Sequence, residues 1–272
     1  MKIGVLNGLR NGGRCFDRVQ QFGLDVCQLS VWAGPEATPE VADVVKEESA
    51  RTGVRVCAVW GGWPGKAEWN FTSGPTTLGI VPREMRRERL DALKHEADFA
   101  QRCGAPALIT HVGFIPENIT DPMFDEVVEA IREIAVHCDQ LGLGFWFETG
   151  QETPVTLLRT IKRVGTGNLG INLDPANLIL YGKGNPVDAL DVFGEYVTNI
   201  HVKDGLYPTD PDKLGEEVKP GLGKVNFPVF VKRLKEIGFD GEWIIEREIP
   251  EGDEQTRDIR DTVENLKVWW NA

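Results

Sequence analysis

The feature that most constrains this chain is a regular alternation between short apolar runs, rich in β-branched and aromatic residues, and longer segments of helical periodicity. Such short runs predict buried strands, whereas apolar residues recurring every three to four positions predict amphipathic helices. Strands are predicted at residues 2–7, 25–31, 55–60, 107–111, 144–148, 169–174, 197–203 and 242–246. Helices are predicted at residues 14–22, 38–52, 83–103, 122–140, 153–164, 187–194, 227–237 and 254–270.

The ends of these segments carry the residues that helix termini require. A capping side chain accepts a free backbone N–H, and proline at the first helical position has no N–H to leave unpaired. This device occurs at Thr38-Pro39, Asp121-Pro122, Thr153-Pro154 and Asn185-Pro186. Glycine commonly ends a helix, because it adopts the left-handed conformation without strain. The corresponding residues are Gly53, Gly104, Gly142, Gly165 and Gly238.

Strand–helix units of roughly 30 residues, joined by right-handed crossovers, fit either a closed barrel or an open doubly wound sheet. Eight units that end in a helix favour the single (β/α)8 TIM barrel, which typically has about 250 residues, and this chain has 272. No linker or shift in composition divides it, so residues 1–272 are expected to form one domain.

Composition excludes several classes of protein. The five cysteines form no CxxC pair, so a disulfide framework is not expected and a reducing cytoplasm is the predicted location. We find no apolar run of about 18 residues and no signal-peptide pattern at the start, so no membrane association is expected. The net charge of −12 repels polyanions, which argues against nucleic acid as a partner.

Ionisable residues lie at or near the ends of the last four predicted strands: Glu148, Asp174, His201 and Glu246. In a barrel these strand ends meet at one face, where active sites are built. One such carboxylate could simply cap the next helix, but a set of three carboxylates and one imidazole would be mutually repulsive without a cation. The oxygen majority favours Mn²⁺, with Mg²⁺, Co²⁺ and Zn²⁺ also compatible. The sequence therefore predicts one divalent metal ion.

The motifs around these residues resemble a known family over the whole chain. They are Phe147-Glu148-Thr149, Asn172-Leu173-Asp174-Pro175, His201-Val202-Lys203-Asp204, Gly221-Leu222-Gly223 and the segment from Gly241 to Glu246. Their order and placement are similar to those of the xylose isomerase-like TIM barrel superfamily. That superfamily contains sugar and sugar-phosphate isomerases and epimerases, inosose dehydratases and endonuclease IV. The resemblance implies a Glu, Asp, His, Glu metal site at the same four positions, and a possible homo-oligomer.

The chain also departs from its relatives. Many of them have a histidine three residues after the strand 6 aspartate, where this chain has Asn177. Endonuclease IV binds three zinc ions with additional histidines, whereas this chain has four histidines in all, and two of them, His95 and His137, fall inside predicted helices. The acidic charge of the chain would also repel the DNA backbone, so an endonuclease function is disfavoured.

Several neighbouring residues are candidates for substrate contact. They are His111 at the end of strand 4, Trp60 at the end of strand 3, Glu152, Asn177, Lys203 and Arg247. Each also has a structural alternative, such as a helix-dipole interaction for Glu152 and salt bridges for Lys203 and Arg247. Two long loops, 61–82 with three large aromatic residues and 204–226, follow strand ends and could contact substrate or simply pack.

The resemblance and the site together predict a metal-dependent sugar isomerase or epimerase. Glu148 and Glu246 would be both metal ligands and catalytic bases, moving a proton next to a carbonyl through a metal-stabilised enediolate. Two alternatives remain: a dehydratase acting on an inosose or keto-sugar, and a non-catalytic module that binds metal or sugar. The expected partner is a small carbohydrate.

Overall fold

Eight parallel strands close into a barrel in the computed structural model, which describes residues 1–32 and 36–272. The strands are β1 (Lys2–Gly8), β2 (Val26–Val31), β3 (Arg55–Gly61), β4 (Ala107–Thr110), β5 (Gly144–Glu148), β6 (Leu169–Leu173), β7 (Val197–Val202) and β10 (Glu242–Ile245). Each pairs with the next one along the chain, and β10 pairs with β1, where Glu242 lies opposite Lys2. This last pairing confirms the barrel and excludes the open sheet.

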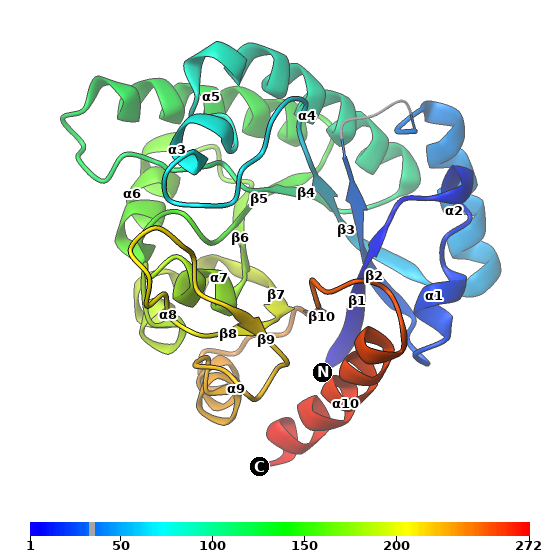
Figure 1. The fold of residues 1–272 in the computed structure, drawn as a ribbon. Coiled ribbons are helices and arrows are strands. Elements are labelled where there is room, and N and C mark those ends of the chain that lie inside the picture. The colour runs from blue at the N-terminus through cyan, green and yellow to red at the C-terminus, as the bar shows by residue number, and fades with distance from the viewer. Residues whose placement is uncertain (33–35) are drawn as a thin grey trace.

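Helices form a ring around the barrel, as Figure 1 shows. They are α1 (Asp17–Gln20), α2 (Pro39–Thr52), α4 (Arg83–Cys103), α5 (Pro122–Gln140), α6 (Pro154–Val164), α8 (Pro186–Phe193), α9 (Phe227–Glu236) and α10 (Asp253–Asn271). All eight predicted helices are present, although α1 is much shorter than expected. The sequence analysis missed the short elements: α3 (Gly74–Thr77), α7 (Pro175–Leu180), the 3-10 turns Asn11–Gly13 and Gly194–Tyr196, and the strands β8 (Asp204–Gly205) and β9 (Glu217–Val218). Elements this short show no hydrophobic period, so pattern alone does not reveal them.

The predicted caps are confirmed. Side chains of Thr38, Asp121, Thr153 and Asn185 each accept a hydrogen bond from a backbone N–H in the first turn of the following helix. The five cysteines are buried free thiols. Among the described residues, no helix combines the length and the apolar character needed to cross a membrane.

The loop after β3 is held to the barrel by a buried arginine. Arg89 of α4 donates three hydrogen bonds to backbone carbonyls of the loop, at Gly79 (2.6 Å), Lys66 (3.0 Å) and Pro64 (3.2 Å). Gly79 has a φ of 65°, and a β-carbon there would lie 1.9 Å from the carbonyl oxygen of Val112. The loop therefore has one defined path across the mouth of the barrel.

The loop after β7 is organised by the carboxylate of Asp204. This side chain is fully buried and accepts four backbone N–H bonds, from Gly205, Gly221 and Gly223 (2.9 Å each) and from Val225 (3.1 Å). Gly223 is required here, because a β-carbon would lie 2.1 Å from the Asp204 carboxylate. The Gly221-Leu222-Gly223 turn is thus the wall of an anion-binding nest that a side chain of the protein itself fills.

Removing this carboxylate tests its structural role. Asp204→Ala leaves four backbone N–H groups, two of them in buried hydrogen bonds, without their charged acceptor, so we expect the free energy of unfolding to fall by about 3 kcal/mol. Asp204→Asn keeps one carbonyl oxygen and is expected to lose less. Chemical denaturation measures both, and an Asp204→Ala variant as stable as the wild type would contradict this role.

Candidate metal centre

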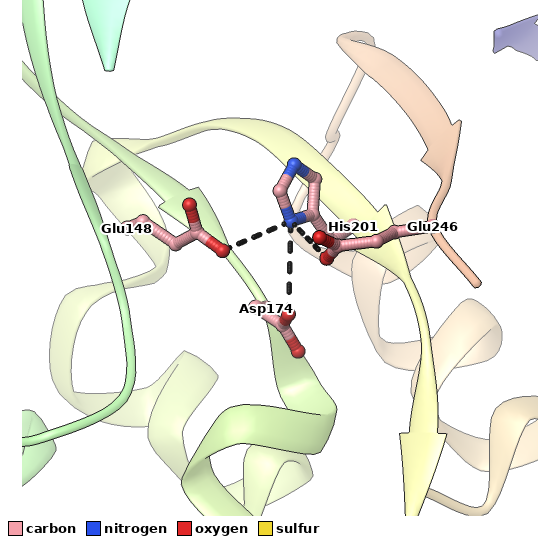
Figure 2. Close-up of side chains that lie close together, drawn as sticks. All are labelled: Glu148, Asp174, His201 and Glu246. Carbon is pink, nitrogen blue, oxygen red and sulfur yellow. Dashed lines mark ion pairs between the residues drawn. The ribbon is translucent and has the colours of Figure 1, made fainter. Parts of the chain in front are cut away.

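The four predicted ligands meet at the carboxyl ends of their strands. Glu148 ends β5, Asp174 directly follows β6, His201 lies in β7 and Glu246 directly follows β10. All four side chains are buried, and one ligand atom from each lies within 4.8 Å of the others. Figure 2 shows the three carboxylates directed at one ring nitrogen of His201.

The distances and the hydrogen bonding fit a divalent cation. Nδ1 of His201 lies 3.2 Å from Oε1 of Glu148, 3.6 Å from Oδ2 of Asp174 and 2.9 Å from Oε2 of Glu246. Three of these buried atoms, Nδ1 of His201, Oδ2 of Asp174 and Oε2 of Glu246, have no hydrogen-bond partner. Leaving buried polar atoms unpaired is costly, and a metal ion would satisfy all three at once. The donor set of oxygens with one imidazole nitrogen is suited to Mn²⁺, Mg²⁺, Co²⁺ or Zn²⁺.

A glutamine behind the cluster fixes the tautomer of the histidine. Oε1 of Gln28, in β2, lies 2.8 Å from Nε2 of His201. Gln28 Nε2 donates to Oδ1 of Asn172 (3.2 Å), which also accepts from Nδ2 of Asn199 (2.9 Å). The amide oxygen can only accept, so Nε2 carries a proton, and Nδ1 is the nitrogen whose lone pair would bind a metal once its own proton is displaced. The sequence analysis missed Gln28, because a polar residue inside a predicted strand gives no sign of the partner that it meets across the barrel.

Loss of the hydrogen bond between Gln28 and His201 is expected to weaken metal binding. Gln28→Leu removes the acceptor that orients the ring, so the dissociation constant for Mn²⁺ should rise about 10- to 100-fold. Calorimetric titration of metal-stripped protein measures it, with Gln101→Leu on the exposed face of α4 as the matched control. Wild-type affinity in Gln28→Leu would refute a role for Gln28 in holding the ligand.

The charges of the cluster act strongly on one another. Burial alone would lower the pKa of His201, but the carboxylates of Glu148 and Glu246 raise it well above its usual value. Burial alone would raise the pKa of Glu148, but the imidazoles of His111 and His201 hold it well below its usual range. The site therefore stabilises positive charge at its centre, which is the property of a cation site.

Two predicted substrate contacts hold Glu148 in place. The indole N–H of Trp60 donates a hydrogen bond to Oε2 of Glu148, and Nε2 of His111 lies 3.4 Å from Oε1. Nδ1 of His111 is buried without a partner. Both side chains also line a cavity of about 320 Å³ above the cluster, so each contacts a candidate metal ligand and faces the space where a substrate would bind.

Asn177 and Lys203 also line this cavity. Asn177 is in α7, where its backbone N–H bonds to Asp174 (2.9 Å) and its amide is 3.4 Å from Oε1 of Glu148. Asp174 is therefore both a helix cap and a candidate ligand, two roles that the sequence analysis treated as alternatives. Nζ of Lys203 lies 2.6 Å from Glu248, 3.4 Å from Glu246 and 3.6 Å from Asp174.

The remaining two predicted contacts lie apart from the cavity lining. Arg247 pairs with Glu217 (2.8 Å) and Asp258 (2.9 Å), which favours the salt-bridge role that the sequence left open. Glu152 is 4% exposed and precedes α6, near His111 but outside the residues that line the cavity. Tyr181 and Glu248 also line it and were not predicted as contacts, whereas Trp69 belongs to the loop 61–82, for which the sequence left substrate contact and packing open.

Burial of Glu152 predicts a pH dependence of stability. Desolvation raises the pKa of Glu152 from 4.5 to about 7, so the folded protein binds this proton more tightly than the unfolded chain. Between pH 4.5 and about 7 the carboxyl ionises in the unfolded chain but stays protonated in the folded protein, so the free energy of unfolding falls as the pH rises. Relative to the wild type, Glu152→Gln should gain up to about 3 kcal/mol of unfolding free energy between pH 4.5 and 7.

Denaturation of both proteins across this pH range measures the difference. Glu254→Gln on the exposed start of α10 is the control and should show no such gain. Parallel pH profiles for Glu152→Gln and the wild type would contradict the prediction.

Comparison with known proteins shows the family of the chain. The family described as xylose isomerase-like TIM barrel matches residues 16–269. The chain belongs to this family. A xylose isomerase domain protein from Planctomyces limnophilus shares 34% sequence identity and a TM-score of 0.92, over 98% of this chain and 96% of that one.

Two further matches are more distant. A D-tagatose 3-epimerase-like protein has a TM-score of 0.74 at 21% identity, covering 100% of this chain and 97% of that one, which shows a shared fold. An uncharacterised protein of Methanocaldococcus jannaschii is 26% identical over 197 residues, 68% of this chain. That match spans 62% of the length of the archaeal protein.

Proposed function

We propose that the protein is a divalent-metal-dependent epimerase or isomerase of a sugar or sugar derivative. The observation that carries the proposal is the position of two glutamates on either side of the same histidine nitrogen, as Figure 2 shows for Glu148 and Glu246. Both also line the cavity. A substrate carbon held between them would have one carboxylate near each face. The name of the D-tagatose 3-epimerase-like structure supports the same class of reaction.

The residues of the chain divide the chemistry between them. A bound divalent cation, Mn²⁺ by the oxygen-rich donor set, would polarise a substrate carbonyl and stabilise negative charge beside it. Glu148 is ionised, because two imidazoles lower its pKa, and so it can accept a carbon-bound proton. The Trp60 indole and the Asn177 amide orient that carboxylate. Glu246, on the other side of the cluster, would deliver a proton to the opposite face to form an epimer, or to the neighbouring carbon to form an isomer.

The substrate expected from the site is a small carbohydrate. The cavity combines polar groups near the metal position with the aromatic surfaces of Trp60 and Trp69. Polar groups can bond sugar hydroxyls, whereas indole rings pack against the apolar face of a sugar. A non-catalytic binding module would have no use for two carboxylates placed to exchange protons.

Deuterium exchange tests the proposed reaction. We expect the Mn²⁺-loaded protein to incorporate solvent deuterium into a ketose from a panel of free and phosphorylated ketoses and inososes, followed by NMR. Glu148→Gln and Glu246→Gln, assayed at saturating Mn²⁺, should each lower the exchange rate at least about 100-fold. Elemental analysis of the same variants separates loss of the base from loss of the metal.

Glu251→Gln is the matched control, because that glutamate lies outside the cavity and pairs with Arg10 and Arg18. It should retain wild-type exchange. Loss of water from a substrate would instead indicate a dehydratase, and the absence of exchange on every compound would refute both enzymatic functions.

A further inference from the structure

The aromatic wall of the cavity has an inner and an outer tier. Trp60 and His111 form the inner tier, since both contact Glu148. Trp69 and Trp32 form the outer tier. The Trp69 ring packs edge-on against His111, with centroids 5.1 Å apart, and is 40% exposed, whereas Trp60 is 7% exposed. Trp32 packs on Trp60 and is 49% exposed. A substrate held at the metal position would meet the inner tier with its reacting carbons. The outer tier would meet a part of the substrate that does not react.

Within the outer tier, Trp69 is fixed before any ligand arrives. Glu68 and Asn70, on either side of Trp69, are both tied to α3: the Glu68 N–H bonds to Thr77, and Oδ1 of Asn70 accepts from Ser73 (2.7 Å) and Gly74 (3.3 Å). Behind the ring lies Trp63, with centroids 6.1 Å apart. The guanidinium of Arg89 stacks 5.6 Å from the centre of Trp63. A half-exposed indole held this firmly loses little conformational entropy when a ring packs on it.

The charge of the cavity disfavours a phosphate at this place. Among the lining residues that the structure describes, Lys203 is the only lysine or arginine. Its ammonium group already faces three carboxylates, those of Glu248, Glu246 and Asp174. In the metal-loaded protein the ion would offset the charges of Glu148 and Glu246, which leaves Glu248 paired with Lys203 in the lining. The described lining therefore offers a dianionic group no lysine or arginine that lacks a carboxylate partner, whereas an uncharged group needs none.

We infer that Trp69 is a subsite for an uncharged ring attached to the reacting sugar. The substrate class is then a glycosylated ketose or keto-glycoside, in which a second sugar ring stacks on the indole, and not a ketose phosphate. This inference rests on the proposed function for the identity of the reacting unit. The stacking itself is a property of the loop after β3 and can be measured by binding alone.

Three ketoses that differ only at carbon 6 test the inference. D-fructose carries a free hydroxyl there, isomaltulose a glucosyl group and D-fructose 6-phosphate a phosphate. Their dissociation constants for the metal-loaded protein are measured by calorimetry and by tryptophan fluorescence. We expect isomaltulose to bind about two- to tenfold more tightly than D-fructose, the range of one aromatic stacking contact. D-fructose 6-phosphate should bind more weakly than D-fructose.

Variants assign the preference to one side chain. Trp69→Ala should bring the ratio of the isomaltulose and D-fructose constants close to one, and Trp69→Phe should restore most of it. Tyr207→Ala is the control, since Tyr207 is 43% exposed on the other long loop and is not part of the lining. Thermal melts followed by circular dichroism confirm that each variant is folded.

The outcomes separate this inference from the proposed function. Three results would overturn the subsite, whatever the exchange assay shows. Isomaltulose could bind no more tightly than D-fructose, its preference could survive in Trp69→Ala, or D-fructose 6-phosphate could bind most tightly of the three. A preference that depends on Trp69, in a protein that exchanges no deuterium, upholds the subsite and refutes the epimerase.

Discussion

Three carboxylates converge on one buried imidazole nitrogen. The rest of the site depends on how the repulsion between these buried negative charges is balanced. Glu148, Asp174 and Glu246 all lie within 3.6 Å of Nδ1 of His201. Charges of one sign do not stay together in a water-poor interior unless a cation balances them. Lys203 supplies part of that balance, and a metal ion bound to the donor atoms that have no hydrogen-bond partner would supply the rest.

A layer of amides supports this cluster from below. Gln28, Asn172 and Asn199 come from three different strands and are fully buried in the barrel. Barrel interiors are usually filled by branched apolar side chains. A hydrogen-bonded layer of amides in that place indicates that it serves to orient the His201 ring. Its contact with Nε2 of His201 leaves Nδ1 as the nitrogen that faces the carboxylates. The orientation of the histidine thus depends on polar residues that are not part of the cavity lining.

The two long loops complete the site by different means. Asp204 gathers four backbone N–H groups and shapes the loop after β7 around a single carboxylate. Arg89 plays the opposite part in the loop after β3, because its guanidinium donates to three backbone carbonyls. The same guanidinium also stacks on Trp63. In both cases a buried charge satisfies backbone groups that a loop leaves unpaired. These anchors give the cavity walls a fixed shape and present Trp69 at its mouth.

Local sequence patterns were enough to predict the barrel and the four residues of the candidate metal site. Periodicity fixed the strands and helices, caps such as Thr38 and Asn185 marked where helices begin, and side chains at the ends of parallel strands necessarily face one edge. These features depend on residues that are close together in the sequence, so sequence patterns reveal them. The likeness of the motifs to a known family then indicated which chemistry such a set performs.

Only the tertiary structure decided which residues support that centre. Gln28 and His201 are 173 positions apart, and no local pattern pairs them. Arg247 stands beside Glu246 in the chain yet turns to Glu217 and Asp258, because successive residues at a strand end point in opposite directions. Trp69 reaches the cavity through a loop whose path depends on Arg89, a residue of the following helix. Contacts of this kind arise when distant segments pack, and so they belong to the fold and not to any stretch of the sequence.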